Sequence, residues 1–352
     1  MDNKKTLIIL TIVFMSFISV WGQKPYRQGT TSGNFLEIGY GSVGNSMEDA
    51  YVSAVNDVSA IYWNPAGLGY MEKNEFQFMA QPWLVDISTS FMGLGFVTPN
   101  YGNFALGLVY VGYGEEEVTN MESQEGTGET FNGSDLAVSI SYGNRIVQWF
   151  SFGATMKYVK SKIWHESASA AAFDLGVIVN TSFLSPTGEK KDGLNIGMSI
   201  SNYGTKMQYD GIDLKQSVDI APDENGNYSH IPVRYELQSW ELPLIFRLGV
   251  SFHPIVINNH SVTIAIDALH PNNNSECVNI GSSYDCIIPT FGVLSLRLGY
   301  KALFQNDSEY GLSFGAGAKI FTLGNNSVNI DYAYRDIGVL GGTHSYTFRI
   351  LF

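Results

Sequence analysis

Apolar and polar side chains alternate over most of the chain after residue 74, and this pattern predicts β-strands. Leu136, Val138, Ile140 and Tyr142 alternate with small or polar residues, and residues 344–352 alternate in the same way. Side chains on a strand point in turn to opposite faces, so each segment has one apolar and one polar face. We predict 14 strands, at approximately 75–83, 88–97, 103–113, 134–144, 149–162, 171–181, 194–203, 243–254, 260–269, 277–285, 290–300, 312–322, 328–336 and 344–352.

The composition of the polar face separates a membrane barrel from a soluble β-sandwich. The surface of a sandwich would carry many charges, whereas here the polar face is mostly Gly, Ser, Ala and Asn. Small polar residues suit the lumen of a barrel whose apolar face is turned to lipid. Strands of about 9–11 residues match a tilted crossing of the hydrocarbon layer. The pattern therefore predicts an all-β fold, a 14-stranded antiparallel transmembrane β-barrel.

The lengths of the connections support the same fold. If the first strand runs outward, the even-numbered connections are periplasmic turns and the odd-numbered ones are external loops. The even-numbered connections are short, with 182–193 the longest, and the odd-numbered ones include the two longest, 114–133 and 204–242. An even number of strands also leaves both chain ends on the periplasmic side. We therefore expect the long loops to face the outside of the cell.

The N-terminus has the features of a cleaved export signal. Lys4 and Lys5 form a basic start, an apolar stretch runs over 7–20, and Gly22 is a small residue at the expected cut. About 14 apolar residues are too few to span a bilayer as a helix. We expect 1–22 to be a signal peptide, 23–73 an N-terminal plug segment and 74–352 the barrel, in the outer membrane of a Gram-negative bacterium.

The net charge limits the classes of binding partner, and the spacing of the cysteines limits disulfide formation. Without Asp2, Lys4 and Lys5 of the predicted signal, 18 basic residues oppose 32 acidic ones, which leaves a net charge of −14. This balance argues against nucleic acid as a partner, because phosphate binding needs a positive surface. Cys277 and Cys286 bracket a strand-like run, and nine extended steps separate them by about 30 Å. We therefore predict no intramolecular disulfide, since bridged α-carbons lie within roughly 7 Å.

Patterns that resemble catalytic or metal motifs lack the context that those motifs need. Residues 39–44 fit G-x-G-x-x-G without a βαβ unit, and 311–315 fit G-x-S-x-G inside an alternating strand. The histidines form no zinc motif, and we interpret His165, which precedes Glu166, as a surface-loop residue. An acidic stretch lacks EF-hand spacing, so we interpret it as a solvated loop; it contains Glu115, Glu116, Glu117, Glu122, Glu125 and Glu129. We predict no enzyme, no cofactor and no metal site.

The stretch 57–68 reads D-V-S-A-I-Y-W-N-P-A-G-L and precedes the first strand. Asp57 or Ser59 can cap a short helix, and Pro65 with Gly67 can end it in a turn. One interpretation is an ordinary loop. The other is that the segment folds into the lumen as a plug, because it lies just before the barrel begins.

The same stretch carries a family resemblance. D-x-S-A followed by N-P-A-G-L is similar to the plug signature of FadL-type outer-membrane transporters, and it is closer still to the PorV/PorQ family. Residues 267–281, 298–317 and 331–344 also agree with the PorV/PorQ pattern. The resemblance implies a 14-stranded barrel in which Asn64, Pro65 and Ala66 lock the turn of the plug. The full plug motif by resemblance is Asp57, Ser59, Asn64, Pro65, Ala66 and Gly67.

The last strand has a second resemblance. Its apolar face is formed by Tyr346, Phe348, Ile350 and Phe352, with Leu351 as the one apolar residue on the other face. A terminal aromatic on such a strand resembles the closing strand of bacterial outer-membrane barrels. The resemblance implies an assembly signal for the barrel assembly machinery.

Charged residues at intervals along the polar faces are expected in the lumen. They allow two interpretations: opposite charges pair across strands and hold the plug, or they line a polar path for a substrate. We favour pairing, because an unpaired charge in a narrow lumen is costly. The predicted lumen charges are Lys157, Asp174, Arg247, Asp267, Arg297, Lys319, Asp331, Arg335 and Arg349.

Three functional hypotheses follow from these features. By its PorV/PorQ resemblance, the chain is a non-enzymatic barrel that assists protein secretion of type IX kind, with loops that dock a cargo protein or a translocon. By its plug motif, it is a FadL-like channel for small hydrophobic compounds such as fatty acids. An outer-membrane enzyme is the third hypothesis, and the missing catalytic constellation argues against it. The predicted partners are outer-membrane lipid, the barrel assembly machinery, and either a secretion component or a hydrophobic ligand.

Overall fold

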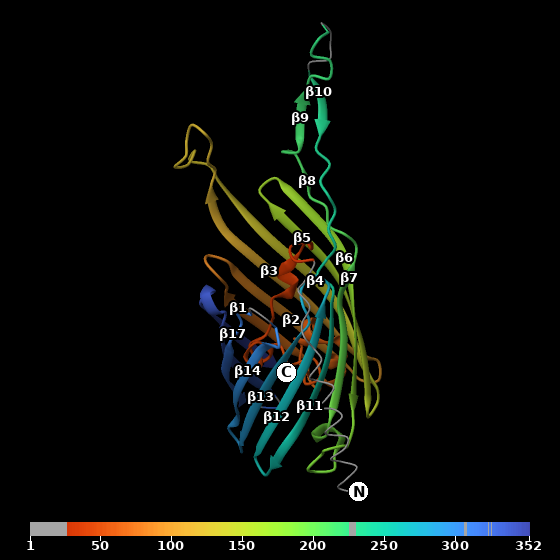
Figure 1. Ribbon diagram of the computed structural model, residues 1–352. Coiled ribbons are helices and arrows are strands. Elements are labelled where there is room, and N and C mark those ends of the chain that lie inside the picture. The colour runs from red at the N-terminus through yellow and green to blue at the C-terminus, as the bar shows by residue number, and fades with distance from the viewer. Residues whose placement is uncertain (1–26, 225–229, 306–307, 323, 325) are drawn as a thin grey trace.

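A computed structural model describes residues 27–224, 230–305, 308–322, 324 and 326–352 (Figure 1). The predicted signal peptide, 1–22, lies outside the described residues. None of the helices in the described ranges has the length and apolar character that a membrane-spanning helix needs.

Fourteen antiparallel strands form a closed barrel, which confirms the predicted fold. Consecutive barrel strands pair with each other; the ring closes where the first strand, β1, pairs with the last, β17. The barrel strands are β1 (Glu75–Pro82), β2 (Ser88–Thr98), β3 (Gly102–Glu117), β4 (Thr130–Val147), β5 (Phe150–Ile163), β6 (Glu166–Asn180), β7 (Asn195–Gly204), β11 (Ile245–Ile257), β12 (His260–Pro271), β13 (Cys277–Ile288), β14 (Gly292–Leu303), β15 (Leu312–Phe321), β16 (Ser327–Asp336) and β17 (Gly342–Leu351).

Several connections differ from the prediction. Strands β3 and β4 extend into the stretch predicted as a loop over 114–133, so that Glu115, Glu116 and Glu117 belong to β3. Strand β6 begins at Glu166 rather than at 171, and its hairpin with β5 makes this odd-numbered connection as short as the turns at the other end. Both corrections have one cause: polar strand ends that extend beyond the bilayer lose the alternation that the prediction used.

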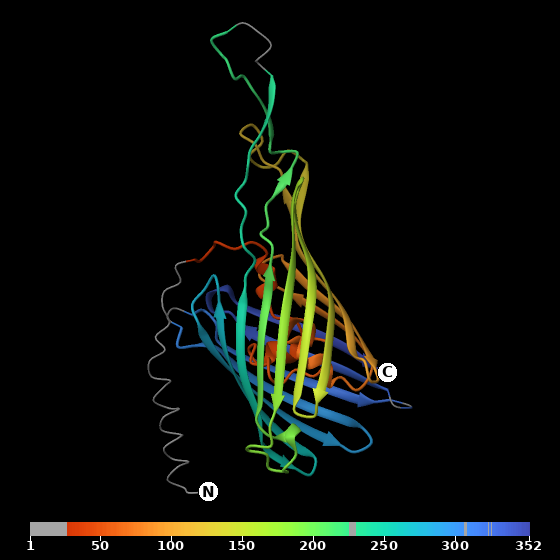
Figure 2. The ribbon, with the colours of Figure 1, turned by 90° about the vertical axis from the view of Figure 1, so that its right-hand side faces the viewer.

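The connection between β7 and β11 contains further strands. Strand β8 (Asp210–Gly211) pairs with the outer end of β6, and β9 (Lys215–Val218) pairs with β10 (Ile231–Arg234). Figures 1 and 2 show the β9–β10 hairpin standing well clear of the barrel, at the end where the long connections lie. This side of the barrel, which also includes the long strands β3 to β6, is the taller one (Figure 2).

The outer face of the barrel is apolar, as the alternation predicts. Leu106, Leu108 and Tyr110 of β3 are exposed, whereas the residues between them point inward. The pairing of neighbouring strands places apolar residues side by side: Leu108 lies opposite Val138 of β4, which lies opposite Tyr158 of β5. This row of outward side chains is therefore apolar on neighbouring strands, as a lipid-facing wall requires.

Most of the described chain before β1 lies inside the barrel (Figures 1 and 2). We call residues 27–74 the inner segment. It contains four short helices: η2 (Asn34–Glu37), α2 (Ser42–Ser46), α3 (Ala60–Trp63) and η3 (Pro65–Tyr70). Helices of one to two turns are marginal alone, so these depend on contacts with the barrel wall.

Candidate functional site in the barrel lumen

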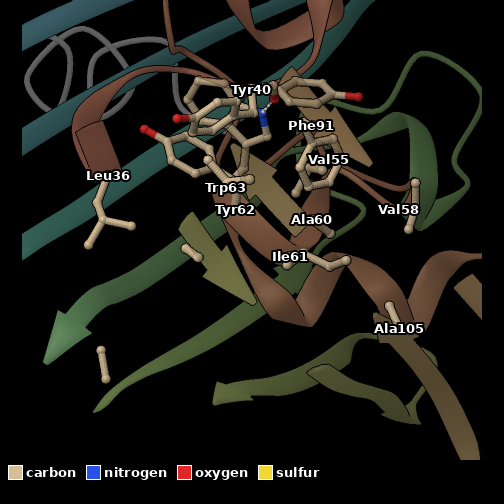
Figure 3. Packing of buried hydrophobic residues seen from close by; sticks show 14 of the residues in the cluster. Leu36, Tyr40, Val55, Val58, Ala60, Ile61, Tyr62, Trp63, Phe91 and Ala105 are labelled. Atoms are coloured by element: carbon tan, nitrogen blue, oxygen red, sulfur yellow. Dashed lines mark hydrogen bonds between the residues drawn. The ribbon is translucent and has the colours of Figure 1, made fainter. Parts of the chain in front are cut away.

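An aromatic cluster fills the lumen beside the first strands (Figure 3). The Trp63 indole donates to the carbonyl of Tyr40 at 2.9 Å, and its ring meets Tyr62 edge-on at 4.7 Å between centroids. Phe91 of β2 packs on Tyr40 from the wall, with ring centroids 6.1 Å apart. Val111 of β3 is fully buried in the same cluster. The lumen at this level is thus a packed apolar core and not the purely small and polar surface that the sequence predicts.

The N-P-A-G-L stretch forms a tightly bonded turn against β4, β5 and β6. The Asn64 side chain accepts from the Ala66 amide at 3.1 Å and so caps η3, while Pro65 occupies its first position. The Asn64 amide also donates to the Val52 carbonyl at 2.9 Å and to the Val177 carbonyl of β6 at 3.2 Å. One buried side chain therefore joins two parts of the inner segment to the wall.

Two glycines in the barrel wall leave room for this turn. A Cβ built on Gly153 of β5 would lie 2.2 Å from the backbone of Pro65, and one on Gly176 of β6 would lie 1.9 Å from the Asn64 side chain. Gly153 and Gly176 are paired across the β5–β6 ladder, so their missing side chains create one recess. The Ser151 hydroxyl, beside this recess, donates to the Ala66 carbonyl at 2.7 Å.

The first residues of the plug motif form an ion pair with the last strand. The Asp57 carboxylate accepts from the Ser59 amide at 2.9 Å and pairs with the guanidinium of Arg349 on β17. Glu75 of β1 lies 3.9 Å from the same guanidinium and accepts from the Val58 amide at 3.0 Å. Thus the start and the end of the barrel are bridged to the inner segment at one point.

A second charge cluster holds the end of α2. The Arg335 guanidinium of β16 lies 3.1 Å from Glu48 and 2.6 Å from Asp49, and Lys301 of β14 donates to Asp49 at 2.5 Å. Burial raises the pKa of Glu48 to about 7, although Arg335 opposes this. Burial acts in the same direction on Asp49, but the charges of Arg335 and Lys301 outweigh it and lower the pKa of Asp49 below its usual range. Both acidic residues have positive φ, 49° and 64°, which the ion pairs keep in place.

The other predicted lumen charges divide into wall pairs and single contacts. Lys157 and Asp174 pair at 2.5 Å across adjacent strands β5 and β6. Arg297 and Asp331 pair at 2.8 Å across the intervening strand β15, where Gly317 leaves the space: a Cβ there would lie 2.1 Å from the Asp331 carboxylate.

Three predicted lumen residues contact something other than an opposite charge. Asp267 accepts from the Val52 amide at 2.8 Å. Arg247 donates to Ser201 at 2.9 Å and lies over the Tyr62 ring. Lys319 belongs to no ion pair among the described residues and lines a cavity.

This cavity, of about 610 Å³, lies between the inner segment and the end of the barrel that carries the short connections. Most of its lining residues are polar or charged, and they include Ser251, Asn195 and Asn329, each with a buried polar atom that no described residue satisfies. Lys191 and Asp192 of η4 (Lys190–Asp192) line it from the β6–β7 connection. The lining suits water and polar groups rather than an oily ligand.

Other candidate residues lie apart from this site. Tyr346 and Phe348 are exposed on the outer face of β17, with Ile350 half-exposed beside them, and Phe352 is exposed directly after the strand. Cys277 and Cys286 both lie on β13. His165 contacts Asp213 at 3.1 Å beyond the outer end of β5. Among the described ranges, no group of three or more His, Cys, Asp or Glu residues is placed to hold a metal ion.

The sequence reasoning missed Glu48, Asp49 and Glu75 as partners of the lumen charges. The predicted lumen charges on the strands include more basic than acidic residues, and that excess was an available signal for further acidic partners. Glu48 and Asp49 come from the inner segment, and Glu75 is the first residue of β1.

The comparisons with known proteins agree with this architecture. A model of the family described as type IX secretion system protein PorV matches residues 22–222, which is more than half of the chain. A search of curated proteins gave no match. The structure of the Pseudomonas putida toluene transporter TodX aligns with a TM-score of 0.53 and 13% identity, and covers 89% of this chain and 96% of TodX.

Two further solved structures align equally well. The Ralstonia pickettii toluene transporter TbuX has a TM-score of 0.53 and 11% identity, with 89% of this chain and 97% of TbuX covered. The monoaromatic hydrocarbon channel CymD has the same TM-score and identity, with 89% and 96% covered. At such low identity the likeness concerns the fold alone, and it agrees with the predicted 14-stranded antiparallel barrel.

Proposed function

Since the chain belongs to the family of the type IX secretion system protein PorV and lies in the outer membrane, we propose that it is a non-enzymatic barrel that assists protein secretion. Family membership confirms the PorV/PorQ resemblance read from the sequence and is the observation that carries this proposal. We infer the secretory role and the absence of enzymatic activity from family membership and from the way the inner segment fills the lumen.

The filled lumen supports a role at the rim rather than conduction. The inner segment is bonded to opposite sides of the wall: Ser42 to Thr347 of β17 at 2.9 Å, and Asn64 to the Val177 carbonyl of β6 at 3.2 Å. Displacing it would break these bonds together with two buried charge clusters. In the proposal, residues 23–73 therefore act as a fixed plug, and the exposed parts of the chain do the work.

The outer connection between β7 and β11 is the best-placed docking element. Its arms expose Ile212, Ile220 and Tyr235, each about 60% exposed, outside the bilayer-facing band. Apolar side chains held in this way on a projecting hairpin favour contact with a protein partner. We propose that this connection docks an exported cargo protein or a component of the translocon.

The test replaces residues 212–236 with a short turn, which leaves the Met207–Trp240 bridge and the barrel ladder intact. A strain lacking the gene is complemented with the wild type, with this variant, or with a control that shortens 119–128. Proteins released into the medium are quantified by mass spectrometry, and folded barrel in the membrane is quantified alongside. We expect cargo release to fall with the hairpin deletion alone. Undiminished release from a strain lacking the gene altogether would reject the secretory role.

The alternative function is diffusion of small hydrophobic compounds, and the fold shared with hydrocarbon channels favours it. Under this alternative, a barrel reconstituted in liposomes takes up a radiolabelled fatty acid or toluene. A variant with residues 57–70 altered should then differ in rate. Equal rates for both barrels and for empty liposomes reject the alternative, and we expect that result because the lumen is filled.

A further inference from the structure

Two lysines stand out on the outer wall of the barrel. Lys160 and Lys162 of β5 are exposed and alternate with the buried Val159 and Ser161, so their side chains point away from the lumen. The other lysines and arginines on the barrel strands in the described part of the chain lie on the lumen side. Neither Lys160 nor Lys162 has an ion-pair partner among the described residues. Two outward lysines are unexpected on the wall of an acidic barrel, because placing a lysine in the hydrocarbon layer is destabilising.

The position of the two lysines along β5 explains why they are tolerated. The outward residues before it, Met156 and Tyr158, are apolar or aromatic and belong to the lipid-facing band. Lys160 and Lys162 follow at steps of roughly 7 Å, toward the end of the barrel that carries the long connections (Figure 1). Tyr110 of β3 lies in the same row as Lys160, across Leu136. Aromatic residues mark the edge of the hydrocarbon layer, so the ammonium groups lie at the level of the lipid headgroups.

The neighbouring strands provide hydroxyls around the two cations. Lys162 lies between Ser134 of β4 and Ser167 of β6, and Lys160 lies opposite Ser169 of β6. These side chains are short, so they leave room beside the ammonium groups while they offer donors. An array of ammonium and hydroxyl donors matches the acceptor oxygens of a phosphate.

Acidic residues near the patch have other partners: Asp210 of β8, which lies opposite Ser167, pairs with Arg234. Glu166 accepts from the Asp213 amide at 2.9 Å and so faces the β7–β11 connection. Asp135 points inward and accepts from the Tyr113 hydroxyl. The patch therefore keeps its positive charge.

We propose that Lys160 and Lys162, with Ser134, Ser167 and Ser169, form a binding site for a phosphorylated glycolipid of the outer leaflet. The acyl chains would lie along the apolar wall of β4 to β6, and the phosphates would contact the two ammonium groups. With the long connections outside the cell, as predicted, the site faces the leaflet that contains lipid A. This inference is independent of the secretory role.

The test uses the purified full-length mature barrel in detergent and two probes: bisphosphorylated lipid A and the same lipid with its phosphates removed. Bound lipid is measured by native mass spectrometry over a titration. We expect the wild type to prefer the phosphorylated probe, and Lys160→Gln/Lys162→Gln to bind it about 30-fold more weakly, from roughly 1 kcal/mol per lysine at a charged membrane surface. Lys215→Gln, on the projecting hairpin, is the control and should bind like the wild type.

Two results would overturn the proposal. One is equal affinity of the wild type for both probes, which would leave only contact with acyl chains. The other is undiminished binding of the phosphorylated probe by the double variant. Heat-modifiable migration in gels reports whether each variant folds. If the double variant does not fold, Lys162→Gln alone, farther from the apolar band, replaces it, with an expected loss of about fivefold.

Discussion

Replacing Asn64 with aspartate would test whether this residue holds the inner segment in the lumen. The substitution keeps the size of the side chain and the oxygen that accepts from the Ala66 amide. It removes the amide group that donates to the carbonyls of Val52 and Val177. Asn64→Asp therefore keeps the cap of η3 but removes the hydrogen bond that links the inner segment to β6.

The cost follows from the burial of this site. Asn64 and Val52 are fully buried, so the Val52 carbonyl loses its donor without gaining water, whereas Val177 is half-buried within the sheet. An unsatisfied buried acceptor costs roughly 1–3 kcal/mol, which is the cost expected from Val52 alone. The ionised carboxylate would also face two carbonyl oxygens, so its folded-state pKa should lie above its unfolded value near 4. A group with a raised folded pKa is least costly below its unfolded pKa, and stability falls as the pH rises through the folded pKa.

Thermal unfolding of the purified barrel in detergent between pH 4 and pH 8 measures this dependence. Digestion with chymotrypsin at pH 8 reports exposure of Trp63, which is buried in the native lumen. We expect Asn64→Asp to lower the melting temperature increasingly toward pH 8 and to speed cleavage of the inner segment, while Asn64→Ala shows the loss without the pH dependence. Asn120→Asp is the matched control, because the Asn120 side-chain oxygen only accepts, from two loop amides. Unchanged melting and cleavage at pH 8 would refute the assigned role of Asn64.

Four further predictions concern other parts of the molecule. Gly153→Val should displace the inner segment and increase chymotrypsin cleavage, because its side chain would occupy the space of the turn, whereas outward-facing Ala154→Val should not. Glu48 has a raised pKa, so its burial reduces stability as the pH rises from about 4.5 to about 7; Glu48→Gln should flatten thermal stability over that range, and an unaltered pH profile would contradict this. Asp49→Asn should lower the melting temperature at pH 7, with a cost of about 3–5 kcal/mol for a broken buried pair, and the difference should shrink progressively as the pH falls below about 4, where the carboxylate of the unfolded chain protonates while the folded one stays ionised. Phe352→Ala should reduce the amount of folded barrel in the outer membrane relative to Leu351→Ala, and equal amounts would count against the assembly signal.

The alternation of side chains was sufficient to predict the barrel because lipid and lumen impose opposite requirements on neighbouring residues. On β17, Tyr346 and Phe348 point to the outside and Thr347 and Arg349 to the lumen, as the pattern predicts. Strand ends were less predictable. Glu115 extends β3 beyond the bilayer, where both faces of a strand contact water and polarity no longer alternates.

The packed interior was not predicted, although β3 contains a signal for it. Residues 104–111 read F-A-L-G-L-V-Y-V, an almost continuous apolar run in which Leu106, Leu108 and Tyr110 face outward. A strand that contacts lipid on one face and water on the other should not place Val109 and Val111 on its inner face. Continuous apolar strands indicate burial on both sides, and here the second side is the aromatic cluster of the inner segment. The inner faces of β11 to β17, which are rich in Gly, Ser and charged residues, instead lie close to residues 46–52 of the inner segment and border the cavity. The two halves of the barrel therefore differ in the polarity of their inner faces because the aromatic cluster of the inner segment packs against only one of them. Comparing the inward-facing residues of each strand would have predicted the position of this cluster from the sequence.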